Sequence, residues 1–193
     1  MVADVSHKTA PSPVAIAYLT LLLTAIATGG SLFLSLGMGL RACPLCFYQR
    51  TFVMSAFAVL ALCLWNDRSR PGFACFLALP LIWAGLGVAL FHEYLVLSGD
   101  LECPPGVLGL GTAPAQSLAI LALLAATCTV GTGLRHAESN AIPFAAVIAA
   151  IVLGLLLAAA SVASSPPLPP VPTAPYDLEK QPLNTCRPPF HSQ

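Results

Sequence analysis

Apolar residues along this 193-residue chain fall into five long runs, and the stretches between the runs hold most of the charged residues. A run of about 20 apolar residues is long enough to cross the hydrocarbon core of a bilayer as a helix. The pattern therefore predicts five membrane-spanning helices. The predicted spans are residues 13–36, 47–65, 72–97, 117–134 and 141–163.

The composition agrees with this pattern, since 57% of the residues are hydrophobic and only 8% are charged. A soluble globular domain carries about 25% charged residues, so this chain could not cover its surface in water. The predicted fold class is an all-α integral membrane protein, with a transmembrane helical bundle over residues 1–163. The net charge is zero and the charges form no block, which gives no indication of a nucleic-acid partner.

Residues 164–193 form a proline-rich tail, which holds nine of the eighteen prolines of the chain. Such a segment favours an extended spacer of about 3.1 Å per residue. The 23 residues from Ser164 to Cys186 would then reach about 70 Å at most. That is enough to return Cys186 across the membrane surface to the other loops on its side.

Five spans place the connections alternately on the two sides of the membrane. The loop with Cys43 and Cys46, the loop 98–116 and the tail share one side, and the N-terminus shares the other side with two short turns. Short loops rich in lysine and arginine favour the cytoplasm. The N-terminal side has a modest excess of them, through Lys8, Arg68, Arg70 and Arg135. We therefore expect a cytoplasmic N-terminus and an extracytoplasmic, oxidising environment for the dithiol loop and the tail.

This topology divides the seven cysteines into two groups. Three lie within spans, where an unpaired cysteine commonly packs as a small hydrophobic residue; these are Cys63, Cys75 and Cys128. The other four lie outside, an even number in a compartment that favours disulfides; these are Cys43, Cys46, Cys103 and Cys186.

The motif Cys43-Pro44-Leu45-Cys46 lies just before the second span. A Cys-x-x-Cys pair is typical of thiol–disulfide chemistry or of half a zinc site. Proline suits the first turn of a helix, which would place Cys46 near the positive end of the helix dipole. Arg50 follows one turn later on the same face, where it could stabilise a thiolate or the charge on a reduced quinone. The alternative is an arginine that reaches the lipid headgroups.

His92 lies near the outer end of the third span, on the same side as the dithiol. Ionisable residues in a span are functional candidates, and a histidine could donate a hydrogen bond to a carbonyl oxygen or relay protons. The alternative is an interfacial polar pair, formed with Glu93, that reaches water.

Three features together resemble the DsbB family of disulfide bond formation proteins. They are a histidine late in the third span, a cysteine in the next loop, and, between the first two spans, the segment Cys43-Pro44-Leu45-Cys46-Phe47-Tyr48-Gln49-Arg50. The resemblance covers about residues 13–103. It implies a four-helix transmembrane bundle in the bacterial inner membrane. The implied activity is that of a thiol:quinone oxidoreductase, which oxidises a DsbA-like thioredoxin-fold protein and reduces ubiquinone or menaquinone.

The resemblance also implies roles for individual residues. Cys43 and Cys46 would be the quinone-coupled pair, with Cys46 as the thiolate that contacts the ring. Arg50 and His92 would line the quinone site, and Cys103 would form the mixed disulfide with the protein partner. Electrons would pass from the partner dithiol to an outer disulfide, then to Cys43 and Cys46, and then to the quinone.

Two features depart from the family pattern. The chain has a fifth span, and the loop that holds the second cysteine pair in the family contains only Cys103. The remaining outer cysteine, Cys186, lies in the proline-rich tail. Our hypothesis is that Cys103 and Cys186 form the second redox pair.

A different class of function is a cysteine-ligated metal-binding or metal-transport membrane protein, because four outer cysteines could hold zinc. Against it, Cys103 and Cys186 supply no second closely spaced pair, and a closed zinc site leaves Arg50 and His92 without a role. A vitamin K epoxide reductase-like enzyme is a chemical relative, but its quinone-proximal dithiol comes late in the chain, whereas here it comes first. A purely structural membrane protein would leave the dithiol motif unexplained.

Overall fold

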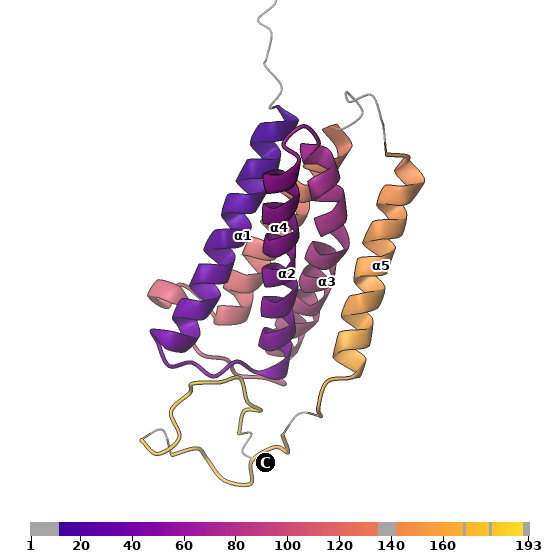
Figure 1. Cartoon of the computed structure of the whole chain (residues 1–193). Helices are drawn as coiled ribbons and strands as arrows, with labels where there is room; N and C mark the ends of the chain where they lie inside the picture. Colours follow the sequence, from indigo (N-terminus) through magenta and orange to yellow (C-terminus); the bar gives the residue numbers. More distant parts are fainter. Residues whose placement is uncertain (1–11, 135–141, 168, 178, 191–193) are drawn as a thin grey trace, which may run out of the picture.

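The structure is a computed structural model that describes residues 12–134, 142–167, 169–177 and 179–190 (Figure 1). Its helices are α1 (Pro13–Leu36), α2 (Pro44–Asn66), α3 (Pro71–Leu97), α4 (Ala113–Gly133) and α5 (Phe144–Ala163), with a short 3₁₀ turn, η1 (Val107–Gly109), before α4. All five α-helices are long and apolar enough to cross a membrane. No strand occurs in the described residues, so the predicted all-α membrane fold is confirmed. Lys8 and Arg135, which contributed to the predicted orientation, lie outside the described residues.

Helices α2 and α4 begin three and four residues before the predicted spans, because capping residues and prolines extend them beyond the apolar runs, whereas α1 begins where predicted and α5 begins at Phe144 rather than at 141. α2 begins at Pro44, since the Cys43 sulfur accepts a hydrogen bond from the backbone N–H of Cys46 and proline fits the first turn. α4 begins at Ala113, since the Thr112 hydroxyl caps it in the same way. The dithiol motif is therefore part of a helix, with Cys46 in its first turn.

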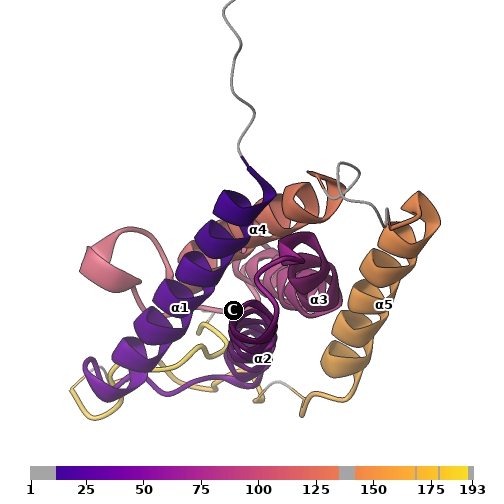
Figure 2. The same ribbon diagram turned by 45° about the horizontal axis from the view of Figure 1, so that its top comes forward.

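Helix α3 is the centre of the bundle and packs against each of the other four helices. In Figures 1 and 2, α1, α2 and α4 surround one part of α3, and α5 lies against its outer side. α5 approaches closely because Gly154 faces α3, where a Cβ atom would fall 2.5 Å from the carbonyl oxygen of Pro80. The core between the helices consists of buried aliphatic residues, among them Leu60, Leu79, Ile82, Leu121 and Leu124.

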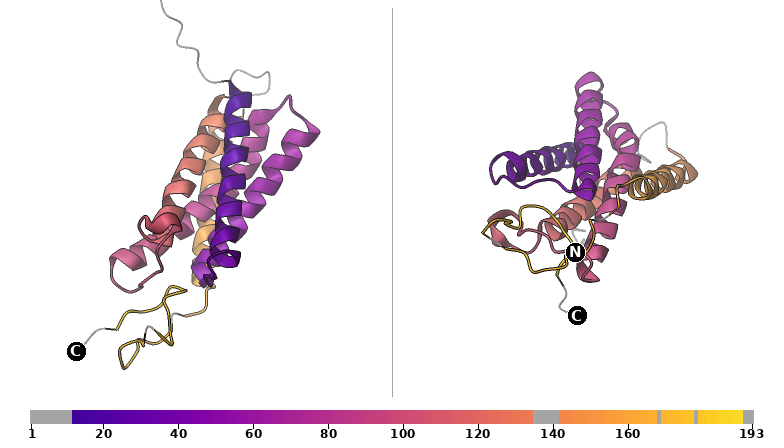
Figure 3. Two further views of the ribbon diagram at one scale, coloured as in Figure 1. Left: turned by 90° about the vertical axis from the view of Figure 1, so that its left-hand side faces the viewer. Right: turned by 90° about the horizontal axis from the view of Figure 1, so that it is seen from below.

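One end of the bundle gathers the α1–α2 loop, the α3–α4 loop and the proline-rich tail (Figures 1 and 3). The backbone N–H of Arg41 donates to the carbonyl oxygen of Asn184 over 2.7 Å, which ties the first loop to the tail. The tail lies at this end because α5, a fifth antiparallel helix, returns the chain to the end at which α2 begins. The predicted grouping of the dithiol loop, the Cys103 loop and the tail at one end is therefore correct.

Candidate functional site: two cysteine pairs around a buried histidine

The dithiol lies at the N-terminus of α2, with the two Sγ atoms 2.8 Å apart and not bonded. The backbone N–H of Cys46 donates to the Cys43 sulfur over 3.2 Å. The pKa of Cys43 is lowered to about 5, chiefly by the hydrogen bond with the Cys46 side chain. Burial opposes this shift, while His92 and the Cys46 backbone N–H support it. Cys43 is therefore a thiolate at neutral pH when this pair is reduced.

Cys103 and Cys186 form a disulfide with an S–S distance of 2.10 Å and a Cα–Cα distance of 4.2 Å, so the predicted pairing is confirmed. A short antiparallel pairing of the neighbouring residues explains it. Glu102 and Arg187 exchange backbone hydrogen bonds of 2.8 and 3.0 Å, one in each direction. In an antiparallel ladder the next pair is not hydrogen-bonded and has its Cα atoms about 4.5 Å apart. Cys103 and Cys186 occupy that pair.

Side chains reinforce the attachment of the tail at this point. The Arg187 side chain is only 12% exposed and forms an ion pair of 2.6 Å with Glu102. Its guanidinium lies 3.6 Å from the centre of the Tyr176 ring and donates to the carbonyl oxygen of Gln181. The Tyr176 hydroxyl donates to the carbonyl oxygen of Pro188. We call Glu102, Tyr176 and Arg187 the tail clasp, because they hold a segment without regular structure against the α3–α4 loop.

His92 of α3 is fully buried and brings the two cysteine pairs together. Its Nε2 atom lies 3.4 Å from the Cys186 sulfur, 3.6 Å from the Cys103 sulfur and 3.9 Å from the Cys43 sulfur. The family resemblance predicts that this histidine lines the quinone site, whereas in the structure its ring faces the sulfurs.

Two polar side chains determine how His92 is oriented. The Ser117 hydroxyl donates to Gln49 Oε1, so the amide nitrogen of Gln49 faces His92 Nδ1 at 3.2 Å and donates to it. A neutral ring whose Nδ1 accepts a hydrogen bond carries its proton on Nε2. The N–H of His92 therefore points at the three sulfur atoms.

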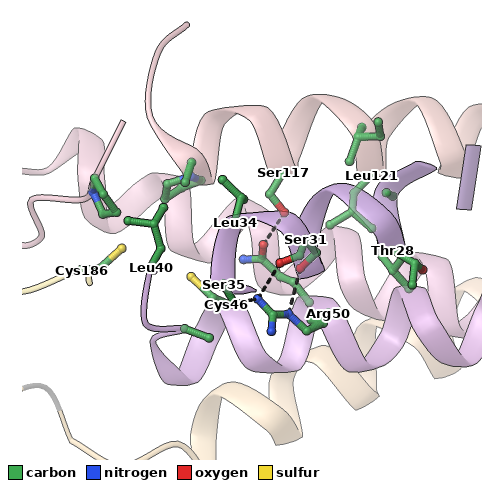
Figure 4. A pocket seen from close by; sticks show the side chains of 18 of the residues that line it. Thr28, Ser31, Leu34, Ser35, Leu40, Cys46, Arg50, Ser117, Leu121 and Cys186 are labelled. Carbon is green, nitrogen blue, oxygen red and sulfur yellow. Dashed lines mark hydrogen bonds between the residues drawn. The ribbon is translucent and has the colours of Figure 1, made fainter. Parts of the chain in front are cut away.

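A pocket lies beside the dithiol, between α1, α2 and α4, and Cys186 of the tail also lines it (Figure 4). Cys46 and Arg50 line it from α2. Arg50 is held by α1, since its guanidinium donates to the Ser31 hydroxyl over 2.8 Å and to the Ser35 hydroxyl over 2.7 Å. Most of the remaining lining is apolar, including Ala27, Leu34, Leu40, Val53, Ile120 and Leu121.

One further lining residue, Thr28 of α1, has a buried hydroxyl for which the described residues offer no hydrogen-bond partner. A buried polar atom without a partner is unfavourable, so a ligand with a hydrogen-bonding group would satisfy it. The lining of the pocket therefore combines the cations of Arg50 and Arg41 and an unpaired hydroxyl with largely apolar walls.

All six predicted site residues thus lie at the same end of the bundle, in two sub-sites that share the dithiol. Cys43 and His92 face the Cys103–Cys186 disulfide, whereas Cys46 and Arg50 face the pocket. His92 is not among the described residues that line this pocket. No sequence motif marks Thr28, Ser31, Ser35 or Ser117, and none of them was predicted. Gln49 lies inside the segment Cys43–Arg50 and was not predicted either, and the same holds for the opposite charges of Glu102 and Arg187 beside the two cysteines.

The same cluster bears on the metal-binding alternative. The sulfur atoms of Cys43, Cys46 and Cys186 and one ring nitrogen of His92 lie within 4.8 Å of one another. However, Cys186 is bonded to Cys103, and a disulfide sulfur is not the thiolate that zinc requires. While the Cys103–Cys186 disulfide is closed, the cluster is therefore suited to thiol–disulfide exchange rather than to holding a permanent zinc ion.

Comparison with known proteins agrees with this chemistry. Residues 13–106 match the protein family described as "Disulfide bond formation protein DsbB". No curated protein and no solved structure matches the chain. The matched region contains Cys43, Cys46, Arg50, His92 and Cys103, and it ends before α4, α5 and Cys186. The resemblance to this family is thereby confirmed, and it supports a membrane protein of disulfide bond formation.

Proposed function

We propose that the protein is a thiol:quinone oxidoreductase of the bacterial inner membrane, with its N-terminus in the cytoplasm and its cysteine pairs outside. It passes electrons from the dithiol of a DsbA-like thioredoxin-fold protein through two cysteine pairs to ubiquinone or menaquinone. The observation that carries this proposal is the convergence of both pairs on His92, whose Nε2 lies within 3.9 Å of three sulfur atoms. A purely structural disulfide would need neither a second dithiol nor a buried histidine beside it.

The outer step begins when a partner thiolate attacks Cys103 and breaks the Cys103–Cys186 bond. Cys186 leaves as a thiolate, 3.4 Å from the nitrogen of His92 that carries the proton. A hydrogen bond from this N–H stabilises the leaving sulfur. The second partner thiol then displaces Cys103, so the partner gains a disulfide. Cys103 and Cys186 together gain two electrons and two protons.

The inner step returns these electrons to the dithiol of α2. The Cys186 thiolate attacks Cys43 of an oxidised Cys43–Cys46 pair, and Cys46 leaves. Cys103 then attacks Cys186, which restores the Cys103–Cys186 disulfide and releases Cys43. The low pKa of Cys43 makes it a good leaving group in this last exchange. The bonding pattern of the structure, with Cys103–Cys186 closed and Cys43 and Cys46 free, corresponds to the product of this step.

The pocket beside Cys46 fits a quinone, since its walls are largely apolar and the unpaired Thr28 hydroxyl can donate to a carbonyl oxygen. A quinone bound there would accept the two electrons and two protons of the dithiol as the Cys43–Cys46 disulfide forms. Arg50, fixed by Ser31 and Ser35, keeps a positive charge at the wall that Cys46 shares. That charge stabilises the negative charge on Cys46 when Cys46 leaves from the Cys43–Cys46 disulfide, and any negative charge that develops in the pocket.

In this proposal His92 serves the sulfurs, as a hydrogen-bond donor during exchange between the two pairs. Its predicted contact with the quinone stays a prediction. Gln49 and Ser117 are positioning residues, because they act on the sulfurs only through the orientation of His92.

The proposal is tested by measuring quinone-dependent oxidation of a reduced thioredoxin-fold protein by the purified enzyme. Wild type should be active and Cys46→Ser should lose activity, while Cys63→Ser, a free cysteine outside the cluster, should retain it. Equal rates for wild type and Cys46→Ser would reject the mechanism. Stoichiometric zinc in the purified protein, with four unreactive thiols, would support the metal-binding alternative instead.

A further inference from the structure

We infer that the fully reduced protein binds one Zn²⁺ ion through the sulfur atoms of Cys43, Cys46 and Cys186 and Nε2 of His92. The inference rests on the proposed function only for the way in which the reduced state arises. The binding itself depends on the positions of these four side chains.

The geometry of the cluster is close to that of a tetrahedral site. Zn–S distances near 2.3 Å and Zn–N distances near 2.0–2.1 Å place the ligand atoms about 3.6–3.8 Å from one another. In the structure, Nε2 of His92 lies 3.4 Å from the Cys186 sulfur and 3.9 Å from the Cys43 sulfur, and all four atoms lie within 4.8 Å of one another. The Cys43–Cys46 separation of 2.8 Å must increase by about 1 Å, and a ligand pair near the 4.8 Å limit must shorten by about as much, through rotation of the side chains.

The oxidation state decides whether this site exists. Zinc requires thiolates, and neither a closed Cys103–Cys186 bond nor a closed Cys43–Cys46 bond supplies them. Opening both disulfides takes four electrons and four protons. Two partner dithiols deliver them and become disulfides. This state accumulates when no quinone removes the electrons. Zn²⁺ then displaces the protons from whichever of the three thiols still carry them.

The tail clasp keeps Cys186 within the cluster after its disulfide opens. Glu102 and Arg187 retain their two backbone hydrogen bonds and their ion pair, none of which involves a sulfur atom. The ligand from the tail is therefore held near the ligands from α2 and α3, which lowers the entropy that metal binding must overcome.

Gln49 and Ser117 can adapt to a metal on His92. When Nε2 binds zinc, the ring proton lies on Nδ1 and needs an acceptor. A half-turn of the Gln49 amide places Oε1 against Nδ1, and the Ser117 hydroxyl then accepts from the amide nitrogen. The same two residues thus support the donor form of His92 and its metal-bound form.

The test is a Zn²⁺ titration of the full-length protein in detergent, in competition with a coloured chelator. The protein is compared in its oxidised form and after phosphine reduction and anaerobic desalting. We expect one equivalent of Zn²⁺ to bind to the reduced form and none to the oxidised form. Reduced Cys186→Ser and His92→Ala should bind at least about tenfold more weakly, and Cys63→Ser should bind like wild type. Co²⁺ should give the intense absorption of tetrahedral thiolate coordination in reduced wild type only.

Absence of Zn²⁺ binding by the reduced wild type would overturn the inference. Equal affinity of reduced wild type and reduced Cys186→Ser would overturn it as well, and equal binding by the oxidised form would remove the redox dependence. The titration contains neither quinone nor protein partner. Failure of the proposed oxidoreductase activity would therefore appear in a separate assay and leave the zinc result unaffected.

Discussion

Glu102 and Arg187 are joined by two backbone hydrogen bonds, of 2.8 and 3.0 Å, and by a side-chain ion pair of 2.6 Å. They lie 85 positions apart in the sequence and directly beside the cysteines of the Cys103–Cys186 disulfide. The tail is therefore held by contacts that persist when the disulfide opens. A cysteine pair that opens and closes in each cycle needs such contacts, because otherwise the reduced tail would leave and re-formation of the bond would slow.

The first prediction concerns this clasp. Glu102→Gln removes the charge from one side of the ion pair and should destabilise the docked, reduced tail by about 1 kcal/mol. The tendency of Cys103 and Cys186 to form their disulfide should then fall about fivefold, as measured by equilibration of the pair with glutathione buffers. Asp177→Asn is the matched control, because Asp177 forms an exposed ion pair with Lys180 within the same tail. An equal effect of both substitutions would show that the clasp has no special role.

The second prediction concerns the acidity of Cys43. Its lowered pKa, about 5, means that the thiolate is present at neutral pH and is lost as the pH falls through that value. In the enzyme with a reduced dithiol, alkylation of Cys43 should be nearly constant above about pH 6 and should fall about tenfold per unit below pH 5. Cys46→Ala removes the main cause and should raise the midpoint more than His92→Ala does, as followed by mass spectrometry of the alkylated peptide. A midpoint near the ordinary cysteine value in wild type would contradict the prediction.

The third prediction separates quinone reduction from disulfide exchange. Arg50→Ala removes the cation beside Cys46 and should slow quinone reduction about tenfold or more, since hydrogen bonds to charged groups contribute about 1.5–3 kcal/mol. Exchange with the thioredoxin-fold partner should change much less, because the disulfide that opens in that step lies against His92, whereas the Arg50 guanidinium is hydrogen-bonded to Ser31 and Ser35. Stopped-flow measurement of each half-reaction gives both rates, with Arg70→Ala at the opposite end of the bundle as the control. Equal loss in the two half-reactions would remove the role assigned to Arg50.

The fourth prediction concerns Thr28. Thr28→Val keeps the shape of the side chain but removes the unpaired hydroxyl, so KM for quinone should rise about fivefold without a change in disulfide exchange. Thr24→Val is the control. It makes the same change one turn earlier on α1, where the hydroxyl already donates to backbone carbonyl oxygens, so KM for quinone should stay at the wild-type value. An unchanged KM in Thr28→Val would indicate that the hydroxyl does not reach the quinone.

Several features of the fold and of the cysteine pairs could be predicted from the sequence, because they depend on the local order of apolar residues, prolines and cysteines. The helices follow the apolar runs, and the start of α2 follows from the proline after Cys43. The Cys103–Cys186 pairing could be inferred because parity placed both residues on one side of the membrane. These inferences require only the hydrophobic effect and the length of a membrane span.

The remaining features depend on how the helices approach one another, which the hydrophobic pattern does not specify. Ser31 and Ser35 reach Arg50 only because α1 packs along α2 at this end. Ser117 reaches Gln49 only because α4, which packs against α3 and α1, brings this side chain opposite the start of α2. His92 could be recognised as a polar residue in a span, but whether its ring faced the pocket or the sulfurs depended on the rotation of α3 about its axis.

The central claim is that two disulfides act in series, and Cys186→Ser tests it most directly. This variant keeps Cys43, Cys46 and the pocket intact but cannot form the outer disulfide. We predict that it loses quinone-dependent oxidation of the thioredoxin-fold partner and still catalyses quinone-dependent oxidation of dithiothreitol, a small dithiol that can react at Cys43–Cys46. Oxidation of the protein partner at the wild-type rate by Cys186→Ser would contradict the account.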